Sequence, residues 1–367
     1  MNHRLSLRHK GFSLVELLVG MAIGLVVTLI IYQVMSTFEG IKRTTTTGSG
    51  TQINGAFSLT AIERDIRAAG YGMPTADIMP CTAYFTYSST AGSPVAGFSG
   101  TPVRITSGGN AAGASDGITV LWGDSVRSNV RNILTQTVQL NPNGGVLYDA
   151  QASTNVAVSG LGGFYWLTDD VGNCALLQRT NAAGGLVIQH AAAAASAGQP
   201  IYNPPNAAGA GWATTYNTNP RVFDTGALTQ RSYSVVNGAL TSQDAFTTTD
   251  NIVLATNIVA LKAQYGISNP GVQDVSAWVG ATGAWAAPSA ANFKRIKAIR
   301  FAVVARSPLS EKPAVAGGAC ATTTVAPTSW PAGPAIDLSN DPNWRCYRYR
   351  VFQTIVPLRN VLWANLS

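Results

Sequence analysis

A long uncharged apolar run stands near the beginning of the chain. From Leu17 to Phe38 there are 22 positions without a charged side chain, and roughly 20 apolar residues suffice for a helix to cross the hydrocarbon core of a membrane. Basic residues precede the run at Arg4, Arg8 and Lys10, which favours a cytoplasmic N-terminus with the rest of the chain on the far side. The run continues into a polar helical stretch instead of ending in the small residues of a secretory cleavage site. We therefore expect a spanning anchor.

The helical pattern extends beyond the apolar run. Within 53–70, apolar residues recur at helical spacing at Leu59, Ile62, Ile66 and Ala69. This spacing predicts an amphipathic helix with one buried face. Gly70 and Gly72, followed by Pro74, predict its end.

Two further expectations concern this helix. The other faces carry Glu63, Arg64, Asp65 and Arg67, and a charged cluster of this kind favours a solvated helix face. The segment TTTTGSGTQ before it is poor in helix formers, so a kink or melted turn is predicted near Gly48–Gly50.

After Gly72 the pattern changes to short apolar runs separated by Gly, Ala, Asn and Ser. Candidate strands are Ile118–Trp122, Val146–Tyr148, Ser232–Val236, Ile252–Leu254, Ile258–Tyr265, Ile299–Ala305 and Tyr347–Val356. Asn237-Gly238 between two such runs predicts a tight hairpin. Loops are expected at Gly108–Ala114, Ala191–Gly198 and Ala207–Gly211. Together the elements predict an α+β protein, with a long N-terminal helix packed on one β-rich domain.

Composition narrows the chemistry. The formal charge is +7, and +4 remains once the three basic residues before the apolar run are set aside, which is ordinary for a protein surface. His190 is the one histidine outside the first ten residues, so metal sites or relays that need two histidines are excluded within the rest of the chain. No nucleophile elbow, P-loop or zinc-protease motif occurs. The sequence therefore predicts neither an enzyme nor a bound cofactor.

A carboxylate interrupts the apolar helix near its start. Glu16 follows Gly11-Phe12 by four positions, and a carboxylate at bilayer depth costs about 2.5 kcal/mol or more, so a functional partner is expected. The N-terminus closely resembles that of type IV prepilins, in the stretch MNHRLSLRHKG-FSLVE and in the apolar helix that follows it. The resemblance implies cleavage between Gly11 and Phe12 by a prepilin peptidase, N-methylation of Phe12, and pairing of Glu16 with the Phe12 ammonium of a neighbouring subunit. Pairing would remove most of the cost of two charges in an apolar bundle.

Later segments extend the resemblance. LTAIERDIRAAGYGMP, VALKAQYGI, IRFAVVARSP and YRYRVFQTIVPLRN are similar, in sequence and order, to the PilW group of minor pilins. The resemblance implies a basic leader at 1–11, a pilin helix at 12–70 with its transmembrane part at 12–38, and an exported globular domain at 71–367. It also implies a single-pass inner-membrane protein with a periplasmic domain, which then joins an extracellular pilus to act in assembly, priming or at the tip.

The expected partners are the prepilin peptidase, other minor pilins, the major pilin, membrane lipid and a large tip adhesin. Two alternatives stay open. One is a pseudopilin of a type II secretion system, which shares the leader and Glu16. The other is a membrane-tethered module that binds DNA or a surface ligand, which a steep salt dependence of DNA binding would reveal.

The four cysteines are Cys81, Cys174, Cys320 and Cys346. By themselves they allow three pairings in an exported domain. Because pilins often carry a disulfide-bounded loop near the C-terminus, the resemblance implies Cys320–Cys346 and leaves Cys81 with Cys174.

Two polar motifs favour structural roles. In RCYRYRVF, alternation on a strand places Tyr347, Tyr349 and Val351 on one face and Arg348 and Arg350 on the other, which indicates a half-buried strand more than a DNA contact. Asp337, Asn340, Asp341 and Asn343, and the pair Asp169-Asp170, lack the spacing of a calcium loop and favour turns.

The leader generates a direct prediction. In cells with an active prepilin peptidase, the mature chain should begin at Phe12 and carry one added methyl group. Intact-mass measurement and N-terminal sequencing of the membrane-extracted protein test this. A mature chain that still starts at Met1 would contradict the prepilin interpretation.

Overall fold

The computed structural model describes the helix and most of the β-rich region. The residues described are 13–74, 83–85, 98, 100–125, 132–133, 138–139, 149–151, 161–169, 172–180, 187–189, 202–203, 215–216, 221–246, 251–311, 313, 317–331, 333–334 and 336–364. The chain forms two compact units, Met1–Gly50 and Thr51–Ser367.

Helix α1 runs without interruption from Leu14 to Ala68. The predicted melted turn at Gly48–Gly50 is therefore wrong, because these residues are helical. Two glycines and a threonine run are weak helix formers, but stopping and restarting a helix requires a second costly nucleation. The predicted end is confirmed: α1 stops at Ala68 and both Gly70 and Gly72 have positive φ.

The strands of the second unit form two larger sheets around α1, a third larger sheet and two small ribbons in the described residues. The order β14-β13-β12-β3-β2 joins Ile252–Thr256, Ala239–Asp244, Leu228–Val236, Gly117–Gly123 and Val103–Thr106. The order β16-β15-β17-β18 joins Ala277–Val279, Ile258–Ile267, Ile296–Arg306 and Tyr349–Pro357. The order β1-β8-β7-β11-β4 joins Ala83–Phe85, Asn173–Gln178, Phe164–Thr168, Arg221–Gly226 and Asn132–Ile133.

The remaining elements are short. Strand β10 (Thr215–Tyr216) pairs with β5 (Val138–Gln139), and β6 (Asp149–Gln151) pairs with β9 (Val187–Gln189). The helical turns are η2 (Gly283–Trp285), α3 (Ala290–Phe293), η3 (Trp344–Cys346) and α4 (Arg359–Ala364).

Most of the predicted strands are present. The runs at 118–122, 232–236, 252–254, 258–265 and 299–305 lie in β3, β12, β14, β15 and β17, and β18 starts at Tyr349, two residues later than predicted. The hairpin is confirmed, because β12 pairs with β13 around Asn237 and Gly238, which both have positive φ. Ser107–Asp116 is a loop, as expected for 108–114. The strand at 146–148 and the loops at 191–198 and 207–211 lie outside the described residues.

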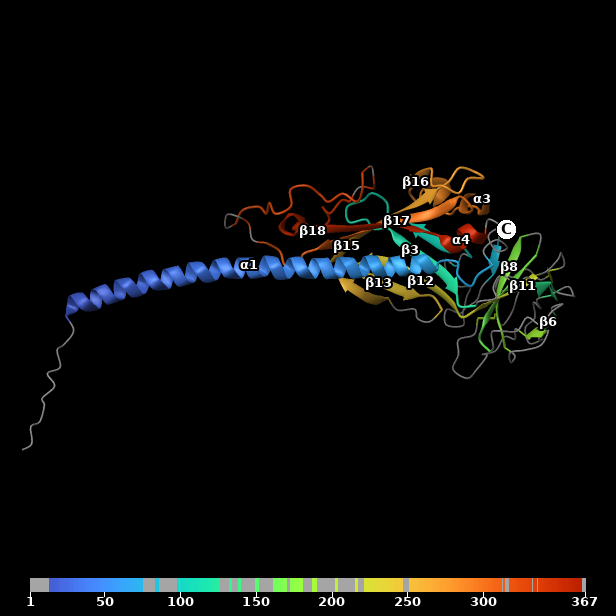
Figure 1. The fold of residues 1–367 in the computed structure, drawn as a ribbon, viewed down its shortest axis with the longest axis horizontal. Helices are drawn as coiled ribbons and strands as arrows, with labels where there is room; N and C mark the ends of the chain where they lie inside the picture. The colour runs from blue at the N-terminus through green and yellow to red at the C-terminus, as the bar shows by residue number, and fades with distance from the viewer. Residues whose placement is uncertain are drawn as a thin grey trace, which may run out of the picture. The chain divides into compact units, whose positions relative to one another are not determined.

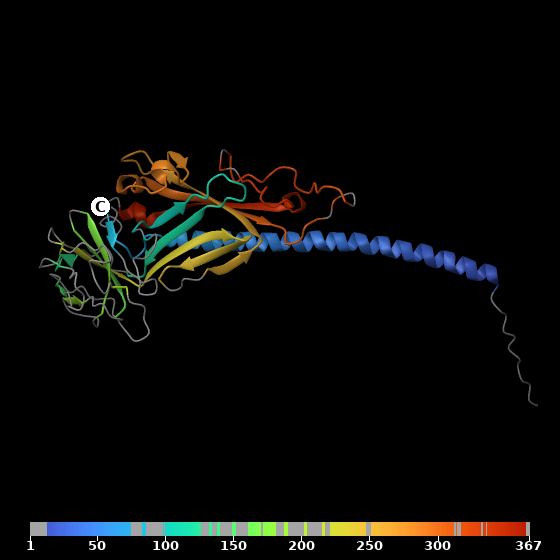
Figure 2. The same cartoon turned by 180° about the vertical axis from the view of Figure 1, so that it is seen from behind.

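A long insertion separates two neighbouring strands. Strands β3 and β12 pair directly, antiparallel, although residues 124–227 lie between them in the chain. This insertion carries β4 to β11. Four of these strands form a sheet with β1 and pack on an aromatic cluster that includes Phe164, Trp166 and Phe223, together with Met73 and Leu121 from outside the insertion. In Figures 1 and 2 this sheet lies beside the C-terminal end of α1.

The main core lies between α1 and the two sheets that flank it (Figure 1). The predicted face is confirmed, because Ile62 and Ile66 are fully buried and Leu59 packs against the same cluster. Gly55 marks the closest approach to β18: a Cβ there would lie 2.1 Å from the Phe352 ring. A side chain at this position would clash with the ring, so the ring or the helix would have to shift.

The charged cluster on α1 differs from expectation at one residue. Glu63, Arg64 and Arg67 are half-buried or exposed, but Asp65 is buried. Its Oδ2 accepts hydrogen bonds from Arg231 Nη1 at 2.7 Å and from Tyr233 Oη at 2.5 Å. Both partners stand on β12, so the carboxylate joins the helix to the sheet. The solvated-face interpretation is wrong for Asp65, because a helix pattern cannot reveal partners 166 and 168 positions away.

The electrostatics of this group are consistent with its burial. Burial, followed by the hydrogen bond and the charge of Asp65, raises the pKa of Tyr233, so the phenol stays protonated and donates. Burial alone lowers the pKa of Arg231, but the Asp65 carboxylate and the bond with Tyr233 outweigh it, and the net pKa is raised. The Arg231 guanidinium therefore stays charged at neutral pH.

The predicted disulfide between Cys320 and Cys346 is present, with the two Cα atoms 4.9 Å apart. Cys174 is also disulfide-bonded, and Cys81 lies outside the described residues. The pairing of β1 with β8 places Tyr84, three residues after Cys81, opposite Cys174. The Cys81–Cys174 bond therefore stays a prediction that this register favours.

Removing the buried carboxylate should destabilise the globular part strongly. Asp65→Ala leaves the Arg231 charge without its partner, and breaking a pair of this kind costs about 3 kcal/mol. Glu63→Ala, two residues earlier, removes a half-exposed pair with Arg67 and should cost only about 0.5 kcal/mol. Thermal unfolding of the purified chain in detergent compares them, and equal losses would contradict the anchoring role of Asp65.

The second disulfide can be tested separately. Non-reducing proteolysis and mass spectrometry should recover one peptide pair that joins Cys320 to Cys346 and another that joins Cys81 to Cys174. A Cys81–Cys346 peptide would overturn both assignments.

Candidate functional site

The N-terminal end of α1 is closed by a reciprocal pair of hydrogen bonds. Ser13, at the N-cap, donates its backbone N–H to Glu16 Oε2 at 3.0 Å, and the backbone N–H of Glu16 donates to Ser13 Oγ at 3.4 Å. This is a capping box, in which Ser at the N-cap and Glu three residues later satisfy two backbone N–H groups. Sequence analysis missed the role of Ser13, although the spacing S-x-x-E directly before an apolar run is a recognised signal.

The capping box uses only part of the Glu16 carboxylate. The bond from Ser13 goes to Oε2, and Oε1 accepts no hydrogen bond from a described residue. The first turn also presents the positive end of the helix dipole, which stabilises a carboxylate there. Glu16 thus caps the start of the helix through one of its two carboxylate oxygens. Gly11 and Phe12, the predicted cleavage and methylation positions, lie outside the described residues.

The segment that follows has the length and composition of a membrane span. Leu14–Phe38 covers 25 residues with a mean hydropathy of 2.7, and its side chains are exposed along the helix. Two of its hydroxyl groups bond within the helix: Thr28 Oγ1 donates to the Gly24 carbonyl at 2.6 Å and Thr37 Oγ1 to the Gln33 carbonyl at 2.9 Å. Internal satisfaction of this kind is what a hydrocarbon environment requires.

The C-terminal part of α1 is tied to the strands by polar contacts at several levels. Thr51 Oγ1 donates to the Arg306 carbonyl at 3.3 Å, and Asn54 Nδ2 donates to the Thr256 carbonyl at 3.0 Å. At the end of the helix, Asn360 Nδ2 donates to the Ala69 carbonyl at 3.1 Å. One stretch of this helix is therefore part of the globular fold, whereas the stretch before Phe38 has its side chains exposed.

The RCYRYRVF segment adopts the predicted alternation. Tyr347, Tyr349 and Val351 are half-buried, and Arg348 and Arg350 are exposed. Both arginines bind groups of the same chain: Arg348 bonds to Glu311, and Arg350 Nη1 donates to Gln52 Oε1 at 2.9 Å. These contacts support the structural interpretation over a DNA contact.

The acidic and amide residues near position 340 act in turns, as predicted. Asp337 Oδ1 accepts from the Ser339 backbone N–H, and Asp341 Oδ1 accepts from that of Asn343, each at 2.9 Å. Asp169 binds Asn173 in the same way, through its backbone and side-chain N–H groups, whereas Asp170 lies outside the described residues. Among the residues that the structure describes, no cluster of three or more His, Cys, Asp or Glu side chains is arranged to hold a metal ion.

Family models match two parts of the chain. The family model described as "Type IV Pilus-assembly protein W" matches residues 215–360, and the prokaryotic N-terminal methylation motif matches residues 6–32. The first match spans the chain from β10 to β18, and the second contains Gly11, Phe12 and Glu16. No curated protein matches the chain.

A solved structure is also similar. It is a type IV-like pilin from Thermus thermophilus, 16% identical, and the match covers 37% of this chain and 69% of that one. Its TM-score is 0.20, too low for any detail to be carried over.

Proposed function

We propose that this chain, which belongs to the PilW family of type IV pilus minor pilins, is inserted through the helix that begins at Leu14, cleaved after Gly11 and methylated at Phe12. It then leaves the membrane to join a pilus. The anchor would keep the leader on the cytoplasmic side and place the β-rich domain in the periplasm, because basic residues precede the apolar run.

One observation carries the proposal. An N-terminal methylation motif at residues 6–32 leads directly into a single helix whose apolar part could span a membrane and whose later part is built into a β-rich domain. A helix with this division can move from lipid into a fibre without refolding. Its exposed apolar surface is buried by lipid before assembly and by neighbouring subunits afterwards.

Glu16 supplies the proposed assembly contact. Cleavage would create an ammonium at Phe12, and an unpaired charge is costly in an apolar helical bundle. The Oε1 atom of Glu16, which the capping box leaves without a bond from a described residue, is available to the Phe12 ammonium of a neighbour. The pair would then mark the axial position of one subunit against the next.

The partners follow from this role. We expect the prepilin peptidase, other minor pilins and the major pilin to contact this chain. The chain itself would prime the fibre or occupy its tip beside a large adhesin. Twitching, adhesion and DNA uptake are all served by pili of this kind. A pseudopilin would share the N-terminal motif, but the match at residues 215–360 is to a pilus-assembly family. The role is structural, and no catalytic step is proposed.

Variants at the capping box separate its two tasks. Glu16→Gln keeps the capping geometry but removes the charge, so processing and membrane insertion should remain while recovery in sheared pili falls about tenfold or more. Glu16→Ala should behave alike, and Glu16→Asp, with a shorter reach, should be partly defective. Ser13→Ala removes a cap worth about 1 kcal/mol but keeps the charge, so pili should still contain it.

Immunoblots of membrane and sheared-pilus fractions provide the measurement, with processed protein in the membrane as the control. Equal recovery of wild type and Glu16→Gln in pili would show that the charge is not an assembly contact. A loss in Ser13→Ala that matches Glu16→Gln would assign the defect to helix capping instead.

A further inference from the structure

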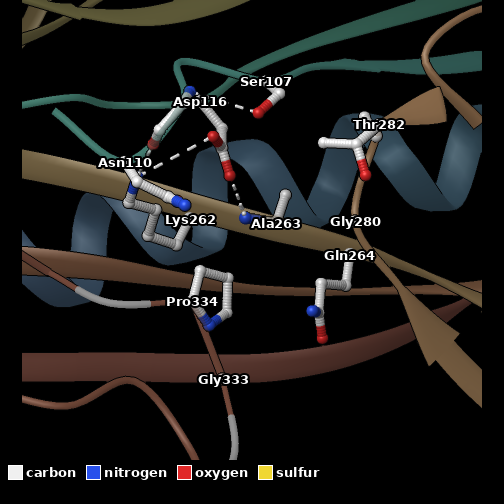
Figure 3. A pocket seen from close by; sticks show the side chains of 12 residues that line it. Ser107, Asn110, Asp116, Lys262, Ala263, Gln264, Gly280, Thr282, Gly333 and Pro334 are labelled. Carbon is white, nitrogen blue, oxygen red and sulfur yellow. Dashed lines mark hydrogen bonds and ion pairs between the residues drawn. The ribbon is translucent and has the colours of Figure 1, made fainter.

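A polar pocket lies on the outer face of the β16-β15-β17-β18 sheet, away from the main core. Its volume is about 210 Å³, far more than the roughly 10–15 Å³ that one water molecule needs. The floor is formed by Lys262 and Gln264 of β15, and the walls come from the Ser107–Asp116 loop, from Thr282 and from Gly333-Pro334 (Figure 3). None of these segments takes part in the proposed membrane or fibre contacts.

Lys262 is the unusual group in this pocket. Its side chain is 1% exposed, and a lysine is almost never buried so completely without partners. The ammonium has three donors, yet among the described residues it makes one hydrogen bond, to the Gly109 carbonyl at 3.2 Å. An oxygen of Asp116 is 4.0 Å away, which is an ion pair without a hydrogen bond. Donor capacity therefore remains at the pocket floor.

Asp116 does not use up that capacity, because its oxygen is 4.0 Å from the ammonium, too far for a hydrogen bond. Oδ1 accepts the backbone N–H of Gly108 at 3.0 Å and Oδ2 accepts that of Ala263 at 2.9 Å. Figure 3 shows the second bond as Asp116 reaches toward β15. The carboxylate thus holds the loop against the strand and offsets part of the Lys262 charge.

The rest of the pocket also offers donors. Gln264 Oε1 accepts from Arg300 Nε and Nη2, at 2.9 and 2.5 Å, so its amide group is left to donate. The Asn110 amide and the hydroxyls of Ser107 and Thr282 line the same space. Ser329 Oγ and Trp330 Nε1, both buried and without a hydrogen-bond partner in the described part of the chain, pack against the wall at Gly333.

A second positive charge, on Arg300, lies beside Gln264 on the neighbouring strand β17. The Arg300 guanidinium lies 4.6 Å from the ring centroids of both Trp278 and Trp330, and no described carboxylate forms an ion pair with it. Burial lowers its pKa without an opposing acid. The site therefore combines many hydrogen-bond donors with two positive charges. Asp116 partly balances the charge on Lys262, and no described acid balances the charge on Arg300.

We propose that this pocket binds a carboxylate group, which accepts hydrogen bonds from the Lys262 ammonium and the Gln264 amide. A monoanion fits better than a phosphate dianion, because Asp116 already places one negative charge beside Lys262. The carboxylate can belong to a small free acid or to an acidic side chain of a partner protein. In the second case the rim of the pocket must also contact the backbone of the partner. The proposal does not depend on the assembly role of Glu16.

The sharpest test is Gln264→Glu. The new carboxylate keeps the shape and pairs with Arg300, so the fold should be retained, but the amide donors are lost and a negative charge stands where the ligand binds. Thr282→Val removes one hydroxyl at an exposed position, and Gln273→Ala is a matched surface control outside the pocket. The mature full-length chain in detergent micelles is titrated with acetate, with its neutral isostere acetamide, with phosphate, and with an N-acetylated aspartate amide.

The readout is the amide resonances of Gly109, Ala263 and Gly280 in TROSY spectra. Acetate should shift them to saturation, Gln264→Glu should weaken the affinity about tenfold or more, Thr282→Val should weaken it less, and Gln273→Ala should not change it. Tighter binding of the blocked aspartate than of acetate assigns the site to a protein side chain, and the reverse assigns it to a free acid. The proposal would be overturned if the shifts rose linearly with acetate without saturating, or if acetamide shifted the same resonances as much as acetate. It would also be overturned if phosphate bound more tightly than acetate, or if Gln264→Glu bound acetate with unchanged affinity.

Discussion

The globular fold depends on one helix that must satisfy two environments. The stretch from Thr51 to Ala68 fills the space between two sheets, and it does so with a narrow stripe of buried residues that includes Gly55, Ile62 and Ile66. Because the same helix extends to Leu14 with apolar side chains exposed along its length, the fold must hold its later part firmly. Apolar packing resists separation of helix and sheet but fixes rotation and sliding only loosely. A directional contact is needed to set the register.

Asp65 provides this contact. A buried ion pair contributes little net stability, because desolvation offsets most of the attraction, but it penalises every arrangement in which either charge is left alone. Arg231 and Tyr233 both lie on β12. A shift of the helix by one turn would therefore leave the carboxylate buried without these partners. The group therefore acts mainly on specificity: it selects one position of the helix against the sheet. Gly55 acts with it, since only a residue without a side chain lets Phe352 pack so closely.

The two faces of the β16-β15-β17-β18 sheet have different tasks. The inner face, with Leu261, Tyr265 and Phe301, belongs to the main core. The outer face carries Lys262, Gln264 and Arg300, and is covered in part by the C-terminal chain that the Cys320–Cys346 disulfide closes into a loop. Charged residues are stable there because each has an aromatic ring, a carbonyl or a carboxylate beside it. A face built in this way can bind a polar group without disturbing the core that holds the helix.

The sequence by itself determined the features that local physics controls. The apolar run, the end of the helix at Gly70 and the Asn237-Gly238 hairpin were all predicted, because membrane transfer, positive φ and turn geometry depend on neighbouring residues alone. The prepilin resemblance identified the family, and a family match now supports it. The capping box at Ser13 was local too, and it was readable but not recognised.

Only the tertiary structure decided the features that depend on distant partners. Asp65 looks like one more solvated charge in the sequence, and its burial follows from residues more than 160 positions later. The continuity of α1 through Gly48–Gly50 reflects cooperative helix formation, which outweighs weak local propensity. The burial of Lys262 depends on a loop, a strand and the C-terminal chain that meet in space. A charge becomes an anchor or a binding group only when folding removes water from it and supplies its partners, and no local pattern records that event.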